Sequence, residues 1–274
     1  MARQNGPSVR LLEIGFMKKI LKIIGICAAT LVVAVIVLGL VFFAGLQKAG
    51  SGPPLGAGLE PVQDGMSTVY LLDAGNGQLV LVDAGNDVKG TAIQAALANR
   101  HATADNVAAI LITHAHPDHD ATIALFPKAE IYALKREVPL ADGSESFQGP
   151  VLRLFGAHNT HPFRVSHPLD DGEKFAIGNL DVTAFAVPGH TPGSAAYLVS
   201  GVLFMGDSAQ ITSKQQLIGP NGLFSNDTSE GAASLKHLDQ ELQPRAAEIK
   251  FLSTAHTGNI AGLEPLNQFA SATR

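Results

Sequence analysis

The sequence predicts an α/β domain with one membrane-spanning helix in front of it. Between residues 60 and 274, short apolar runs typical of buried strands alternate with longer helical patterns. Residue types that bind metals follow several of these apolar runs directly. An uncharged run over residues 23–46 precedes the whole pattern.

The first 46 residues are predicted to anchor the chain in a membrane. Residues 1–22 are basic, with five Lys and Arg against one Glu. As a helix, the run 23–46 is about 36 Å long, enough for a hydrocarbon core of about 30 Å. A cleaved signal peptide fits less well, because its apolar core is shorter and Phe42-Phe43-Ala44-Gly45 is a poor cleavage site. We therefore expect a single-pass anchor, with residues 1–22 in the cytoplasm and the remaining domain outside it.

Composition limits the classes of function. Residues 47–59, rich in Gly, Pro and Ala, are predicted to form a short flexible linker. Beyond residue 48 the chain carries 13 Lys and Arg against 23 Asp and Glu, a net charge of −10. This part lacks the basic face expected for nucleic-acid binding, and it contains no cysteine for a disulfide or a thiol nucleophile. Residues 60–274 are expected to form one domain; its oligomeric state is not predicted.

The elements of this domain are predicted from periodicity and turn residues. A hairpin is expected at 67–72 and 78–82, joined through Asn76-Gly77. Further strands are expected at 107–111, 130–133, 174–177, 180–187, 195–199, 202–204 and 251–253. Helices are expected at 88–100, 120–126, 231–241 and 263–270. Residues 136–161 fit no pattern, and their His158 and His161 are expected to be histidines of a surface loop.

The densest group of candidate metal ligands follows the 107–111 strand, in His114-Ala115-His116-Pro117-Asp118-His119. Residues two apart in extended backbone point the same way, so His114 and His116 can converge on one ion. Pro117 disfavours helical geometry at His116 and fits the first turn of a helix. That turn re-aims Asp118 and His119 towards a second point. Imidazole and carboxylate together suit zinc, with iron or manganese as alternatives.

Three later segments also place a candidate ligand after an apolar strand. They carry His190 in Pro188-Gly189-His190-Thr191-Pro192, Asp207 in Gly206-Asp207-Ser208, and His256 in Thr254-Ala255-His256-Thr257. Any one of them alone is also typical of a simple turn or a helix cap. Their recurrence at strand ends favours a metal site.

In this combination of motifs, the chain resembles the metallo-β-lactamase superfamily of metallo-hydrolases over roughly residues 60–260. The resemblance rests on the His114–His119 motif, His190, Asp207 and His256 in the family's order, with Leu81-Val82-Asp83-Ala84-Gly85 upstream. It implies an αβ/βα four-layer sandwich: two mixed β-sheets flanked by helices, with the metals at one edge between the sheets. One departure is Asp120-Ala121-Thr122, where members usually carry glycines, and we expect an adjustment of packing there.

The resemblance also implies a ligand assignment for two divalent metal ions. It places His114, His116 and His190 on the first ion, and Asp118, His119 and His256 on the second, with Asp207 bridging both. Asp83 is implied to support the site from beneath. Two ions about 3.5–4 Å apart can share a hydroxide at neutral pH, which then attacks a polarised carbonyl or phosphoryl group. Asp118 is the expected catalytic residue, as a ligand that also orients the nucleophile or relays a proton.

The expected function is therefore a membrane-anchored dizinc hydrolase that cleaves a small ester, thioester or lactone. The resemblance makes an aspartate at position 207 typical of bridged dimetal members rather than of true β-lactamases. Phosphodiesterase or β-lactamase activity on the same fold, a mononuclear iron oxidoreductase of the sulfur dioxygenase type, and a binding module without catalysis are the alternatives. A serine hydrolase is disfavoured because no Gly-x-Ser-x-Gly motif is present. Phe147, Phe163 and Phe224 are candidates for an apolar pocket wall or for ordinary packing.

Overall fold

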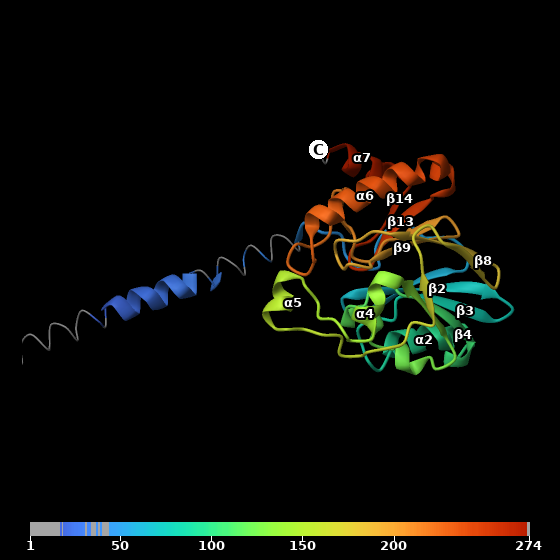
Figure 1. The fold of residues 1–274 in the computed structure, drawn as a ribbon, viewed down its shortest axis with the longest axis horizontal. Helices are drawn as coiled ribbons and strands as arrows, with labels where there is room; N and C mark the ends of the chain where they lie inside the picture. The colour runs from blue at the N-terminus through green and yellow to red at the C-terminus, as the bar shows by residue number, and fades with distance from the viewer. Residues whose placement is uncertain are drawn as a thin grey trace, which may run out of the picture. The chain divides into compact units, whose positions relative to one another are not determined.

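The structure, a computed structural model, describes residues 17, 19–30, 32–33, 37, 39 and 44–272 and divides into two units, Met1–Gly45 and Leu46–Arg274 (Figure 1). In the first unit, residues 19–30 are helical and their side chains are exposed. Among the described residues, no helix is long and apolar enough to cross a membrane. The predicted span 23–46 lies partly outside the described residues, and the anchor remains a prediction.

The second unit contains a first sheet of six strands in the order β1-β2-β3-β4-β5-β6. These are Leu59–Asp64, Ser67–Gly75, Gln78–Val82, Val107–Leu111, Glu130–Leu134 and His167–Leu169. The predicted hairpin is confirmed as β2 and β3, because Asn76 and Gly77 take the positive φ angles of 52° and 74° that a tight two-residue turn requires. Strands β3 to β6 are parallel, so their carboxyl ends lie at one edge.

A second six-stranded sheet has the order β14-β13-β10-β9-β8-β7. Its strands are Gly258–Ala261, Phe251–Thr254, Val202–Phe204, Ala195–Val199, Leu180–Ala186 and Lys174–Ile177. Strand β10 is parallel to β13, and β8 runs in the same direction because β8 and β10 are both antiparallel to β9. The carboxyl ends of β8, β10 and β13 therefore meet at one edge. A separate two-stranded sheet pairs β11 (Gln210–Ile211) with β12 (Leu217–Ile218).

The α-helices of this unit are α2 (Thr91–Asn99), α3 (Pro117–Asp120), α4 (Val138–Ala141), α5 (Pro150–Leu154), α6 (Thr228–Leu242) and α7 (Glu264–Ala272). Short 3₁₀ turns lie at Ala104–Asn106, Ile123–Leu125, Lys135–Glu137 and Gln243–Glu248. The prediction of one helix over 120–126 was wrong. The backbone N–H groups of Ala121 and Thr122 donate instead to the carbonyls of Gly85 and Ala84, which interrupts the helix after Asp120.

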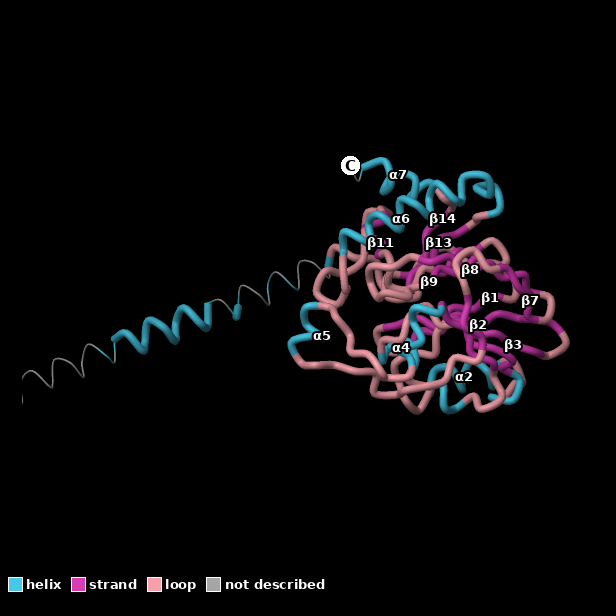
Figure 2. Tube along the Cα trace, viewed as in Figure 1, coloured by secondary structure: helices cyan, strands magenta, loops and turns pink. Residues whose placement is uncertain are grey.

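Three apolar layers separate the sheets and helices. Side chains alternate along β2, so that Leu71 packs outward with α2 while Leu72 packs between the two sheets. Helices α6 and α7 cover the outer face of the second sheet, with Leu235 and Leu266 in that third layer. Figure 1 and Figure 2 show α2 and the α6–α7 pair on opposite sides of the paired sheets. Two mixed sheets flanked by helices, as predicted, are confirmed.

The expected linker differs from a freely flexible segment. Leu46 forms an antiparallel bridge with Thr212, and the N–H of Gln47 donates to the carbonyl of Ile211 at 2.9 Å. The Gln47 side-chain amide donates to the carbonyl of Asn259 at 3.1 Å, and Leu55 is buried. These contacts hold the chain against the β11–β12 hairpin and β14 from residue 46 onward, although its composition alone is typical of a loose connection.

Candidate metal centre

The candidate ligands come together where strands of both sheets end. The histidine motif follows β4 of the first sheet, whereas His190, Asp207 and His256 follow β8, β10 and β13 of the second sheet. Because β8, β10 and β13 end at one edge, their following loops reach a common point. The Ala195 N–H donates to the Thr113 carbonyl at 2.8 Å, which ties the second sheet directly to the motif loop.

The turn predicted inside the motif is confirmed. His116 has extended backbone angles, φ −74° and ψ 148°, and Pro117 occupies the first turn of α3. His114 and His116 precede the helix, His116 with extended backbone, whereas Asp118 and His119 lie on its first turn. The change from strand-like to helical geometry gives the two pairs different directions.

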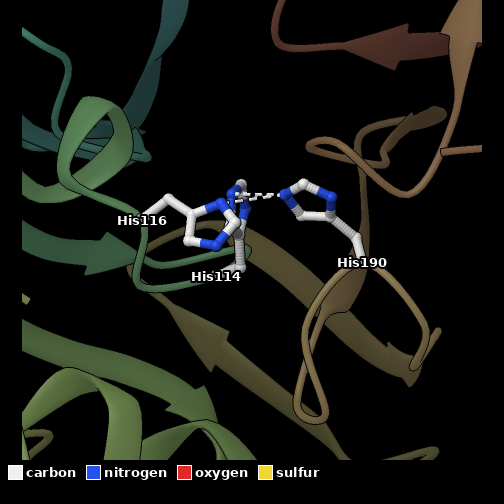
Figure 3. Close-up of side chains that lie close together, drawn as sticks. All are labelled: His114, His116 and His190. Carbon is white, nitrogen blue, oxygen red and sulfur yellow. Dashed lines mark hydrogen bonds between the residues drawn. The ribbon is translucent and has the colours of Figure 1, made fainter. Parts of the chain in front are cut away.

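The imidazoles of His114, His116 and His190 converge on one point (Figure 3). Nε2 of His190 lies 3.1 Å from Nε2 of His114 and 3.0 Å from Nδ1 of His116. All three side chains are buried, with residue exposures of 1%, 6% and 2% for His114, His116 and His190. This is the predicted three-histidine group, and its ring nitrogens face each other rather than solvent.

A second group consists of Asp118, His119 and His256. Nε2 of His256 lies 3.2 Å from the Asp118 carboxylate, and Nε2 of His119 lies 3.6 Å from the same carboxylate oxygen. His119 is fully buried, whereas the side chains of Asp118 and His256 are about one quarter exposed, at 24% and 22%. The second group is therefore the side of the cluster that reaches solvent.

Asp207 lies between the two groups. Its carboxylate oxygens are 3.1 Å from Nε2 of His256, 3.6 Å from Nε2 of His119 and 3.7 Å from Nε2 of His190. Asp207 also forms a possible ligand set with His114 and His119, one residue from each predicted site. The structure thus brings all seven predicted residues into one cluster, with Asp207 between the two groups.

The cluster has the properties of a site that accepts metal. Two of its buried polar atoms, Nε2 of His119 and Oδ1 of Asp207, have no hydrogen-bond partner. An unsatisfied buried polar atom costs about 1–3 kcal/mol, and a divalent ion between these atoms would satisfy both. The donor set of imidazoles and carboxylates is also the one that zinc, iron and manganese prefer. The residues present therefore fit a pair of divalent ions.

Neighbouring groups orient the histidine rings. Asp83 accepts hydrogen bonds from the Thr113 N–H at 2.8 Å and from Nδ1 of His119 at 2.9 Å, which leaves Nε2 of His119 facing the cluster. Nδ1 of His256 donates to the carbonyl of Met66 at 2.7 Å. Nδ1 of His190 contacts the Ser225 hydroxyl at 2.9 Å. Asp83 lies beneath the site as the resemblance implied; Met66 and Ser225 were missed because no sequence spacing connects them to the histidines.

The two groups differ in charge. Burial lowers the pKa of His114 and His116 well below 6.5 and that of His190 to about 4, so these three imidazoles are neutral. Burial acts the same way on His119 and His256, but the adjacent carboxylates outweigh it and raise the pKa to about 9 and about 11, respectively. The same pairing lowers the pKa of Asp118 to about 2, against the effect of burial. Without metal, the cluster therefore carries its protons on His119 and His256.

Metal binding is accordingly expected to release protons from one group only. At pH 7.5, an ion at the Asp118 group must displace about two side-chain protons, one each from His119 and His256, whereas the three-histidine side chains release none; a water that ionised on binding would add its own proton to the total. Since protons compete with the metal, affinity at the Asp118 group should rise with pH until these pKa values are passed. Zinc titration of the metal-free protein in two buffers of different ionisation enthalpy measures the proton count.

His256→Ala provides the matched comparison for this proton count. It should abolish the release, because the Asp118 group then no longer binds its ion and the neutral imidazoles of the three-histidine group have no proton to lose. Zinc binding without net proton release in the unaltered chain would contradict the charge assignment.

Of the three phenylalanines that were candidates for a pocket wall, one lies next to the cluster. A small cavity of ≈ 20 Å³ is lined by His116, His190, Phe147 and Asn226, among others. The Phe147 ring packs edge-on against His116 at 4.7 Å between centroids, so Phe147 is the predicted apolar wall residue that reaches the site. Phe163 packs against the outer core of the first sheet instead, and Phe224 remains 37% exposed.

The departure after the motif has a structural explanation. Asp120 is completely buried and accepts a hydrogen bond from the Asn159 side-chain amide at 2.7 Å. Burial raises the pKa of Asp120 to about 8. Asp120 thus attaches the segment around Asn159 to α3. In that segment His158 is exposed, as predicted, and His161 lies 3.7 Å from the Asp120 carboxylate.

Comparisons with known proteins agree with this fold and site. The family model described as the Metallo-beta-lactamase superfamily matches residues 62–250. A hydroxyacylglutathione hydrolase of Shewanella sp. (strain ANA-3) is 29% identical over 150 residues, which cover 53% of this chain and 45% of that protein. The probable metallo-hydrolase YflN of Bacillus subtilis (strain 168) is 26% identical over 226 residues, covering 73% of this chain and 85% of that protein.

A solved structure also resembles the chain. The metallo-beta-lactamase family protein TTHA1429 of Thermus thermophilus superposes with a TM-score of 0.60 at 25% identity, covering 80% of each chain. A two-sheet α/β sandwich with a histidine and aspartate cluster at the strand ends defines the general class. The chain belongs to the metallo-beta-lactamase superfamily, since the family model covers well over half of it. It spans less than half the length of the hydroxyacylglutathione hydrolases that it matches.

Proposed function

We propose that the protein is a metal-dependent hydrolase that holds two divalent ions, zinc in the first instance, and cleaves a small ester, thioester or lactone. The observation that carries this proposal is the position of Asp207. Its carboxylate lies within 3.7 Å of histidines from both groups, so one residue can link two ions. Three histidines would hold the first ion, and Asp118, His119 and His256 the second.

The chain's own residues contribute orientation, exclusion of water and a proton acceptor. When bound, divalent ions supply Lewis-acid activation of water and of the scissile carbonyl. The buried rings of His114, His116 and His190, with Phe147 packed against His116, exclude solvent from one side of the site. Asp118 lies on the other, partly exposed side, with its carboxylate next to His256. This position suits Asp118 to orient the attacking group or to accept its proton.

Thioesters are the first substrates to test. Several matched relatives are named hydroxyacylglutathione hydrolase, at 29–36% identity, and this supports a thioester at the level of a proposal. The protein should be assayed with a panel of thioester, ester, lactone, phosphodiester and β-lactam substrates. Turnover of an acyl substrate, absent in a His114→Ala variant, is the expected outcome. Turnover of only the phosphodiester or only the β-lactam would contradict the proposed substrate class.

We also propose that residues 23–46 anchor the protein in a membrane with the catalytic domain outside the cytoplasm. The uncharged run and its basic flank support this, and so do the exposed apolar side chains of the described helix, such as Leu21, Ile23 and Ile24. A phosphatase reporter fused after Lys48 should be active, because this reporter folds only outside the cytoplasm. An inactive reporter that is located in the cytoplasm, or a processed chain that begins after residue 46, would contradict the anchor.

The basic flank itself offers the control for this topology. Replacing Lys18, Lys19 and Lys22 with Gln removes three of the five positive charges that precede the run. The reporter signal should then become mixed or inverted, because the excess of Lys and Arg sets orientation.

A further inference from the structure

Glu137 is a completely buried carboxylate at the end of the 3₁₀ turn Lys135–Glu137, immediately after β5. Oε1 accepts a hydrogen bond from the Ala115 N–H at 2.7 Å. Oε2 accepts from the Thr191 hydroxyl at 2.7 Å and from the Gly193 N–H at 3.0 Å. Each of these recorded donors is neutral, so the carboxylate is held by hydrogen bonds rather than by an ion pair.

These donors belong to the two loops that carry the three-histidine group. Ala115 is the residue between His114 and His116, in the loop that follows β4 of the first sheet. Thr191 and Gly193 follow His190, in the loop after β8 of the second sheet. One carboxylate therefore binds both ligand loops, and its two oxygens divide between the two sheets.

The loop of His190 is packed directly onto the turn that carries Glu137. A Cβ atom added to Gly193 would lie 2.1 Å from the backbone nitrogen of Glu137, so only glycine permits this approach. Thr191 is fixed as well, because its N–H donates to the Ser194 hydroxyl at 2.9 Å. On the side of the second sheet, the contact is therefore close and hydrogen-bonded.

The chemistry of the carboxylate is matched to its donors. Two of them are backbone N–H groups, which can only donate, so the position requires acceptors on both oxygens. A glutamine is nearly the same shape but has one acceptor and one donor. Its amide nitrogen must face either Ala115 or the Thr191–Gly193 pair. A donor there meets another donor, so the hydrogen bonds to that loop are lost.

Burying a carboxylate is unfavourable unless its hydrogen bonds offset the loss of water. Burial raises the pKa of Glu137 to about 7, despite three donors that favour the charged form. If residue 137 served only to fill space, an apolar side chain would do so without the free-energy cost of burying a carboxylate.

We propose that Glu137 is a positioning residue for the metal centre: by binding the loops of both sheets, its carboxylate sets the separation of His116 and His190 and preorganises the three-histidine group for a divalent ion. This inference rests on the proposed metal-dependent function. Glu137 has no recorded contact with a candidate ligand side chain, and it acts through the backbone on either side of them.

The test compares Glu137→Gln with Glu241→Gln, the same chemical change on the exposed face of α6. In the full chain, Zn²⁺ affinity is measured by competition with a chelator, and the visible spectrum of the Co²⁺-loaded protein reports ligand geometry. Glu137→Gln should weaken Zn²⁺ binding about 10–100-fold and change the Co²⁺ spectrum. Glu241→Gln should do neither. The melting temperature of the metal-free protein separates this effect from general destabilisation.

Thr191→Val gives a second measurement if Glu137→Gln does not fold. It removes one of the three donors and keeps the side-chain shape, so it should weaken Zn²⁺ binding less than Glu137→Gln does. Thr191→Ser keeps the hydroxyl and should bind Zn²⁺ as tightly as the unaltered chain. The inference would be overturned if Zn²⁺ affinity and the Co²⁺ spectrum were unchanged in Glu137→Gln. If Glu137→Gln does not fold, the same result in Thr191→Val would overturn it. Absence of metal binding in the unaltered chain would instead overturn the proposed function, and this inference with it.

Discussion

Replacing Asp207 with Ala is expected to remove the metal ion of the Asp118 group while the three-histidine group stays occupied. Two cations held close together repel each other, and a carboxylate between them offsets part of that repulsion. In the structure this carboxylate is 3.1 Å from His256 and 3.6 Å from His119, so its loss affects the second group most. Loss of groups around a metal commonly costs about 10–100-fold in affinity or activity, and a bridging ligand should cost at least that.

Three measurements on the same variant distinguish this outcome from a structural role. Metal stoichiometry should fall towards one ion per chain, turnover should fall at least about 100-fold, and the metal-loaded protein should remain folded. If Asp207 only capped the turn before Ser208, Ala would lower stability by about 1 kcal/mol and leave both ions bound. Asp181→Ala, at the exposed position of β8, is the matched control and should change none of the three.

Replacing His116 with Ala is expected to have the opposite selectivity. His116 provides one of three buried ring nitrogens in the three-histidine group, and its loss leaves only His114, His190 and the shared Asp207 carboxylate, a weaker ligand set. We expect the metal of this group to be lost and turnover to fall at least about 100-fold. His256→Ala should lose the other ion instead. Each variant should therefore retain one ion, bound at a different site.

The control for both histidine variants is His158→Ala. His158 is an exposed histidine of the segment that follows α5, outside the cluster. Its replacement should leave two ions bound and turnover within about twofold. Loss of metal in His158→Ala, or equal metal loss in all three variants, would show that the site assignment is wrong.

Much of the candidate site was predictable because its ligands obey a local rule. Each follows an apolar run that the structure confirms as a strand: β4, β8, β10 or β13. The turn at Pro117 was also predictable, since proline restricts the residue before it. Which ligands share an ion was implied only by the family resemblance, because convergence of loops from two sheets depends on tertiary packing.

Other parts could not be predicted from local patterns. The edge strand β1 was missed because Leu59–Asp64 mixes Glu, Pro, Gln and Asp with few apolar residues. Strand β6 contains a proline in three residues and was also missed. Residues 136–161 form short helices and loops held by tertiary contacts such as Asp120–Asn159, which have no periodic signature. Glu137 was missed as well, although it follows β5 and the strand-end rule that found the ligands applies to it.

The central claim is that the cluster binds two divalent ions and uses them for hydrolysis. The most direct test is the metal content of the purified full chain by mass spectrometry, paired with turnover of an acyl substrate before and after chelation. We predict two divalent ions per chain, zinc in the first instance, with turnover lost on their removal and recovered on adding Zn²⁺. One iron per chain, or unchanged turnover after metal is verified absent, would contradict the account.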